Sequence, residues 1–229
     1  MGFLDNLFDG SKSVNSDKKG DAVPENVPRS APVLAEMTAP NQPDLPVPFG
    51  YKCSWLCVKS DDPKEVIEKL GLRNPEPANW DKGIEMAYNG CDFVSPSLDG
   101  YVLVVGWGTD VLTLAPELLE DSARKFPELQ YFTTHRVVDY HAWVKYVGGE
   151  LVRGYAWVGC DGELLMNKGE ITPEEERLGF TNLLPSADAD WDKYDKPDED
   201  YVLEIAAAWG IDPSFGNKEY QKSMGYICK

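Results

Sequence analysis

The chain has 229 residues, 42% of them hydrophobic, so it can bury the core of one sizeable domain. Its 39 acidic and 22 basic residues give a net charge of −17. That charge repels phosphate groups, which excludes nucleic acid and anionic membrane as favoured partners. No apolar run approaches the ~18 residues of a membrane-spanning helix, and no basic-then-apolar secretion signal opens the sequence. We therefore expect no integral membrane segment.

The cysteines indicate a reducing compartment. There are five of them, an odd number without the regular spacing of a disulfide scaffold. Cys53 and Cys57 flank Trp55, and no second pair follows at zinc-finger spacing, so we interpret them as buried thiols rather than metal ligands. The predicted location is the cytoplasm.

Residues 1–48 are predicted to form a disordered tail, because they are rich in Pro, Ser and charge and poor in aromatic residues. The tail opens with MGFLDNLF, which could place its four apolar side chains on one helical face and dock in a groove, or could be a frayed end. Residues 49–229 are predicted to form a single domain.

The first half of that domain is predicted to contain elements in the order strand, helix, helix, strand, followed by a third helix. A strand is expected at 51–58, followed by a helix with Asp62 as N-cap, Pro63 as first residue and Gly71 as terminator. A second helix is predicted at 81–88 and an apolar strand at 101–105. A third helix should begin at Pro116 and stop at Pro127.

The second half of the domain is predicted to form a β-meander. Residues 129–147 are β-branched and aromatic, and a two-residue turn at Gly148-Gly149 joins them to a strand at 151–158. A third strand follows at 163–166, then a helix with a capping box from Thr172 to Glu175, and a helix at 202–209. The expected fold class is α+β, an antiparallel β-meander with flanking helices.

The glycine turn sets an expected register. If Val147 faces Glu150, then Trp143 faces Gly154 and His141 faces Ala156. One face of the hairpin would be apolar and the other would be polar with free space above it. The expected polar face carries His135, Asp139, His141, Trp143 and Lys145.

The polar face is the candidate site. Asp139 could orient the imidazole of His141 for acid and base catalysis, with His135 as a further catalytic candidate. The same face could instead bind a ligand or a partner, or it could lie under a helix with its histidines satisfied. Residues six apart on one strand are roughly 20 Å apart, too far for both histidines to hold one metal ion. The binding candidates are Trp143, His135, His141, Lys145 and Arg153.

An acidic stretch follows the meander. Asp188, Asp190, Asp192 and Glu199 occupy positions one, three, five and twelve of a calcium-loop pattern. Position six is Lys193 instead of the required Gly, and Pro197 interrupts the loop. A solvated acidic loop is the alternative. We expect no metal site beyond these calcium candidates, and no cofactor.

Four segments carry a resemblance: SPSLDGYVLVVG, QYFTTHRVVDYHAW, ELVRGYAWVGCDGELLMNKGEITPEE and EIAAAWGIDPS. They resemble a widespread family of bacterial cytoplasmic proteins without an established activity. The resemblance covers roughly residues 95–214, implies a bacterial origin and transfers no catalytic residue.

Charge and motifs together favour a cytoplasmic protein-binding domain, immunity-like or adaptor-like, whose acidic surface engages a basic protein. The alternative is a small-molecule hydrolase or transferase using His141 and Asp139. Against that alternative, the sequence contains no complete nucleophile motif such as G-x-S-x-G.

Overall fold

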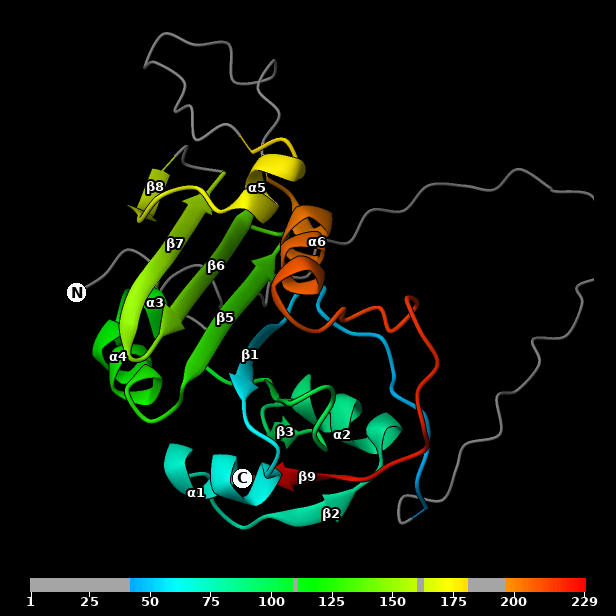
Figure 1. The fold of residues 1–229 in the computed structure, drawn as a ribbon. Coiled ribbons are helices and arrows are strands. Elements are labelled where there is room, and N and C mark those ends of the chain that lie inside the picture. The colour runs from blue at the N-terminus through cyan, green and yellow to red at the C-terminus, as the bar shows by residue number, and fades with distance from the viewer. Residues whose placement is uncertain (1–41, 109–110, 160–162, 181–196) are drawn as a thin grey trace, which may run out of the picture. The chain divides into compact units, whose positions relative to one another are not determined.

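The computed structural model describes residues 42–108, 111–159, 163–180 and 197–229 (Figure 1). Most of the predicted tail, with its apolar opening segment, lies outside these residues. Residues 44–48 belong to the domain, because Asp44 is buried and pairs through its backbone with Ser223. The Asp44 carboxylate also accepts hydrogen bonds from the backbone N–H groups of Trp80 and Asp81, at 2.6 and 3.0 Å. The domain therefore begins no later than Asp44, before the predicted start at residue 49.

Nine strands form one sheet in the order β2-β9-β3-β4-β1-β5-β6-β7-β8, within the described part of the chain. All of its strand pairs are antiparallel. The strands are β1 (Ser54–Lys59), β2 (Glu76–Ala78), β3 (Asp92–Val94), β4 (Tyr101–Val105), β5 (Glu128–His135), β6 (Tyr140–Val147), β7 (Glu150–Val158), β8 (Glu163–Lys168) and β9 (Gly225–Cys228). The α+β prediction is confirmed, and β5 to β8 form the expected meander.

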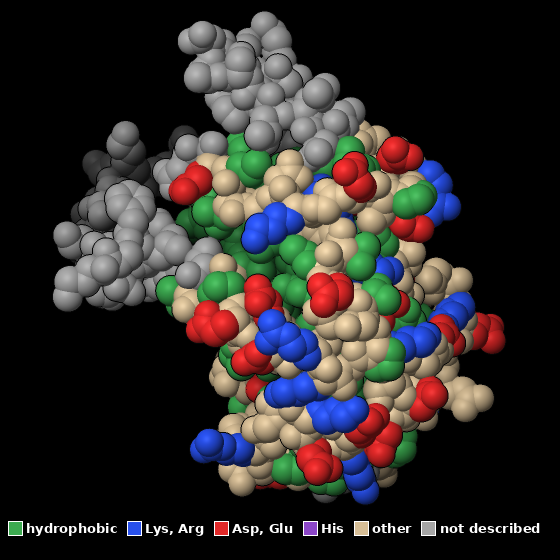
Figure 2. Space-filling view, turned by 60° about the vertical axis from the view of Figure 1, so that its left-hand side comes forward, with side chains coloured by type: hydrophobic (Ala, Val, Ile, Leu, Met, Phe, Trp, Pro, Cys, Tyr) green, Lys and Arg blue, Asp and Glu red, His purple; other side chains and the backbone are tan. Residues whose placement is uncertain are grey.

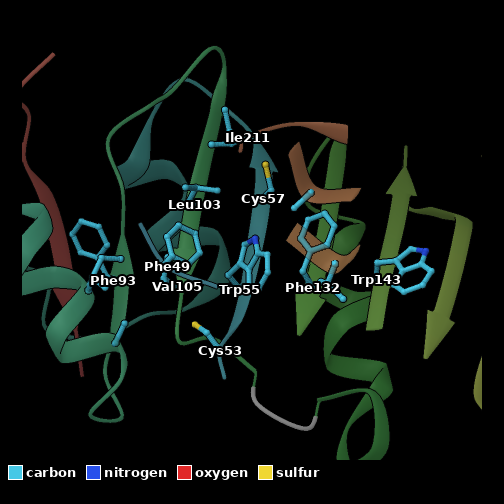
Figure 3. Close-up of a cluster of buried hydrophobic side chains, with 14 of the residues drawn as sticks. Phe49, Cys53, Trp55, Cys57, Phe93, Leu103, Val105, Phe132, Trp143 and Ile211 are labelled. Carbon is cyan, nitrogen blue, oxygen red and sulfur yellow. The ribbon is translucent and has the colours of Figure 1, made fainter. Parts of the chain in front are cut away.

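Helices cover both faces of this sheet. They are α1 (Pro63–Leu70), α2 (Trp80–Ala87), α3 (Val111–Leu114), α4 (Pro116–Ala123), α5 (Pro173–Arg177) and α6 (Glu199–Trp209). On one face, α2 and α6 contribute to an aromatic core that includes Trp55, Phe132 and Trp143 (Figure 3). On the other face, α1, α3 and α4 pack over a second core that includes Leu56 and Leu129. We call these the α6 face and the α4 face.

Local sequence signals set the helix ends. Asp62 accepts a hydrogen bond from the backbone N–H of Lys64, Pro63 opens α1, and Gly71 ends it in the left-handed region at φ 70°. At α5 both hydrogen bonds of the predicted capping box between Thr172 and Glu175 are present. These cap predictions are confirmed.

The segment 129–147 is not one strand, as the sequence predicted, but two. A turn at 136–139 separates β5 from β6, and His135 lies opposite Tyr140. The turn contains no Gly or Pro; Asp139 supplies the left-handed backbone at φ 54°. Because strand-forming residues lie on both sides of this turn, composition alone did not show that the chain reverses direction here.

The Gly148-Gly149 turn is confirmed, and Val147 lies opposite Glu150 as expected. The predicted register fails beyond that point because a β-bulge shifts the pairing between Lys145 and Tyr146. Trp143 then lies opposite Tyr155 instead of Gly154, and His141 lies opposite Trp157 instead of Ala156. A shift of one residue moves every later β7 side chain to the opposite face, so the predicted free space above Trp143 is filled by aromatic rings.

Candidate functional site

The structure brings together only part of the predicted polar face. His141, Trp143 and Lys145 share the α6 face with Arg153, which lies opposite Lys145. His135 lies on the other face, because it pairs with Tyr140 while His141 pairs with Thr134. The two histidines therefore do not form one site, and the reason is the turn at 136–139 rather than distance along a single strand.

His141 and Asp139 are in direct contact. The Nε2 atom of His141 lies 2.9 Å from Oδ1 of Asp139, within hydrogen-bonding distance. The Asp139 carboxylate packs on the backbone of Gly159, where a Cβ atom would lie 1.7 Å from Oδ2. The His141 side chain is only 1% exposed, whereas Asp139 is 41% exposed. The pair has the geometry of an oriented imidazole, but its ring is closed off from substrate.

Arg153 and Glu175 form the most enclosed polar group of the α6 face. Both side chains are 0% exposed, and the Nε atom of Arg153 donates to the two carboxylate oxygens at 2.8 and 3.0 Å. Trp143 donates its Nε1–H to the same carboxylate at 2.8 Å. The guanidinium also lies 5.7 Å from the ring centre of Tyr155 and 5.6 Å from that of Phe180. This arrangement ties β6 and β7 to α5, so Trp143 and Arg153 serve the core rather than a surface.

Lys145 lies at the edge of the same face. Its Nζ atom is 3.2 Å from Oε1 of Glu128 and 5.4 Å from the ring centre of Trp209. The Glu128 carboxylate also accepts a hydrogen bond from Gln130 at 2.6 Å. The ammonium group is thus already paired with an internal carboxylate.

Three of the calcium candidates, Asp188, Asp190 and Asp192, lie outside the described residues. The fourth, Glu199, is buried at the start of α6, where its Oε1 atom accepts a hydrogen bond from the backbone N–H of Lys52 at 3.1 Å. Among the described residues, no group of three or more His, Cys, Asp or Glu side chains could hold a metal ion. Glu199 thus connects α6 to the chain just before β1.

The two cysteines beside Trp55 are both free and buried. Burial raises the pKa of Cys53 and of Cys57 to about 12, because the apolar surroundings disfavour the thiolate. Neutral thiols are poor nucleophiles, so neither cysteine has the setting of a reactive residue.

The α4 face carries an apolar surface that the sequence analysis missed. We call it the outer apolar surface and define it by four half-buried side chains, Leu112, Val138, Val158 and Met166. To these we add two exposed side chains, Leu114 in the helix of Leu112 and Val137 in the turn of Val138. The four half-buried members pack on a small core of Tyr140, Ala142 and Ala156. Figure 2 shows hydrophobic side chains gathered in a hollow on the side of the molecule that carries β8, α3 and α4.

A signal for this surface was present in the sequence. The apolar run around Val111 and Leu112 precedes Pro116, where the predicted helix was expected to begin, and so had no assigned role. In the structure it forms α3, whose Leu114 is 70% exposed. Val137, in the turn that the sequence did not reveal, is 66% exposed.

No family model, curated protein or solved structure matches this chain. In the described parts of the chain, none of the helices is long and apolar enough to cross a membrane.

Proposed function

We propose that this domain is a protein-binding module, immunity-like or adaptor-like, that holds a basic partner protein against its outer apolar surface. The observation that carries the proposal is the exposure of Leu114 and Val137 beside the half-buried side chains that pack on Tyr140, Ala142 and Ala156. Contiguous apolar surface in contact with water commonly marks a site of protein association. Burying it against a partner removes that surface from water and stabilises the complex.

The net charge of the protein is the second observation that supports the proposal. A net charge of −17 attracts a basic protein from a distance and accelerates its association, while the apolar surface provides the contact that slows dissociation. Glu163, at the start of β8, lies opposite Val158 in the sheet and so places a carboxylate beside that surface.

The test is affinity capture from the native host, followed by binding measurements with the captured protein. Replacing both Leu114 and Val137 with Ser should weaken binding by at least about tenfold, because exposed side chains that anchor an interface contribute roughly 1–2 kcal/mol each. Val147→Ser is the matched control, since Val147 is exposed at 44% at the end of β6. Binding that is unchanged in the double variant contradicts the assigned surface, and a captured partner of acidic character contradicts the charge argument.

The contact between His141 and Asp139 favours a second candidate, a small-molecule hydrolase or transferase. This candidate requires an opening movement, because the imidazole is 1% exposed. Copurification of a small molecule without any protein would support it. A His141→Ala variant that retains every detected activity would rule it out.

A further inference from the structure

Within the described part of the chain, β8 is one edge of the sheet and β2 is the other (Figure 1). An edge strand turns every second backbone N–H and C=O group away from the sheet, where another extended chain can pair with them. β2 is a poor template, because it has only three residues and Pro77 among them cannot donate a backbone hydrogen bond. β8 has six residues and no proline. The β8 edge is therefore the one suited to a further strand.

A β-bulge in the pairing with β7 determines which side chains of β8 share a face, because it adds one residue to β8. Glu163 lies opposite Val158, which belongs to the outer apolar surface. Lys168 lies opposite Gly154, which in turn lies opposite Val144 in the core of the α4 face. In a regular strand, residues five apart would lie on opposite faces. The bulge thus brings the two charged ends of β8 to the same face of the sheet.

The charges at the two ends of β8 are available to another molecule. Glu163 and Lys168 are exposed, and neither forms an ion pair with another residue that the structure describes. Between them lie Leu165, which is 37% exposed, and the half-buried Met166. The strand therefore has a negative charge at its start, a positive charge at its end and apolar side chains at its centre.

We infer that β8 pairs antiparallel with β8 of a second copy of this chain, an inference that does not depend on the proposed basic partner. The strand is complementary to itself. When Glu163 lies opposite Lys168 of the second copy, Lys168 lies opposite Glu163 of the second copy. The same register places Leu165 opposite Met166 of the second copy, where pairing removes apolar surface from water.

The bulge is what makes this register possible. Opposite residues of an antiparallel pair must share a face of the sheet, and Glu163 and Lys168 do so only because β8 has the extra residue. The match at both ends favours a second copy over an unrelated strand. The resulting dimer has a two-fold axis perpendicular to the sheet, so the outer apolar surfaces of both copies lie on the same side. Because the net charge of −17 on each copy opposes association, we expect a weak and reversible dimer.

Sedimentation velocity of the full chain at rising concentration tests the inference. Physiological ionic strength is used, since it largely screens exposed charges more than ~8 Å apart. We expect a monomer–dimer equilibrium. Glu163→Lys alone and Lys168→Glu alone should each weaken dimerisation by about tenfold, because two attractive pairs become two repulsive ones. Both substitutions in one chain should restore the dimer, as should mixing the two single variants. Glu219→Lys, an exposed change of the same charge outside the strands, is the control.

A protein that stays monomeric at every concentration overturns the inference. If it is monomeric and Glu163→Lys instead abolishes capture of the basic partner, the β8 edge binds that partner and not a second copy. A dimer that both single variants retain, but that is lost on replacing Leu114 and Val137 with Ser, also overturns the inference, since the outer apolar surface is then the contact. A double charge variant that has wild-type circular dichroism but stays monomeric contradicts the assigned register.

Discussion

Arg153 on β7 and Glu175 on α5 form an ion pair in which both side chains are completely buried. The arginine also donates through Nη1 to Asn167 Oδ1 at 2.8 Å, and the glutamate accepts the backbone N–H of Thr172 at 2.8 Å. The same carboxylate therefore completes the α5 capping box and neutralises the core arginine. A helix cap and a long-range ion pair are thus made by one side chain.

Removing one partner of this pair should destabilise the domain strongly. Glu175→Gln keeps the side-chain shape but leaves the buried charge of Arg153 uncompensated, so we expect a loss of ~3–5 kcal/mol in the free energy of unfolding. Urea unfolding measures this loss. Glu174→Gln is the control, because Glu174 pairs with the exposed Arg177 and should change stability by less than ~1 kcal/mol. A Glu175→Gln variant as stable as that control would show that the pair is not needed.

Gly159 should not tolerate a side chain. Gly159→Ala would place its Cβ atom 1.7 Å from Oδ2 of Asp139, so the carboxylate must move away from His141. We expect a loss of ~1–3 kcal/mol in stability, as for other overpacked sites, and altered NMR signals of the His141 ring. In an Asp139→Gly background the obstructing carboxylate is absent, and Gly159→Ala should then cost much less. Equal costs in the two backgrounds would contradict this account.

Replacing Gly83 in α2 with alanine should have two opposing effects on the stability of the domain. Alanine is favoured over glycine in a helix by ~1 kcal/mol. A Cβ atom at position 83, however, would lie 2.1 Å from the ring of Phe93, which is fully buried. We expect the steric effect to win, with Gly83→Ala less stable than the wild type by ~1–3 kcal/mol in thermal or urea unfolding. Combined with Phe93→Leu, the same change should become less costly or favourable, and failure to do so would contradict the steric explanation.

Asp92 should make stability depend on pH. Burial raises its pKa from 3.8 to about 6, so the folded state holds the Asp92 proton more tightly than the unfolded state. The contribution of Asp92 is therefore most favourable below pH ~4 and is lost as pH rises through about 6. Asp92→Asn should become more stable relative to the wild type between pH 4 and pH 7.5, measured by urea unfolding at both values. Asp61→Asn, an exposed change, should show no such trend, and an equal trend in both variants would exclude Asp92 as the cause.

Local signals in the sequence predicted much of the fold. Asp62, Pro63 and Gly71 define α1, and Thr172 with Glu175 defines the start of α5, because each signal acts within one turn of helix. Gly148-Gly149 likewise identified the hairpin between β6 and β7. The order of the predicted elements, a strand meander with helices before and after it, predicted the α+β class.

The candidate site depended on features that local signals do not encode. The turn at 136–139 and the bulge beside Lys145 placed His135 on one face and Tyr155 over Trp143 on the other. No glycine or proline lies at either position, so neither the turn nor the bulge could be predicted from turn-forming residues. The outer apolar surface likewise joins α3 to strands more than 20 residues away in sequence.

The sequence by itself determined the helices α1, α2, α4, α5 and α6, the hairpin around Gly148-Gly149 and the net negative charge. Only the tertiary structure decided that His141, Trp143 and Arg153 are buried, that Arg153 is paired with Glu175, and that Leu114 and Val137 remain in contact with water. The physical reason is that caps and turns are satisfied by neighbours in the chain. Register, burial and exposure instead depend on which distant side chains compete for the same face of the sheet.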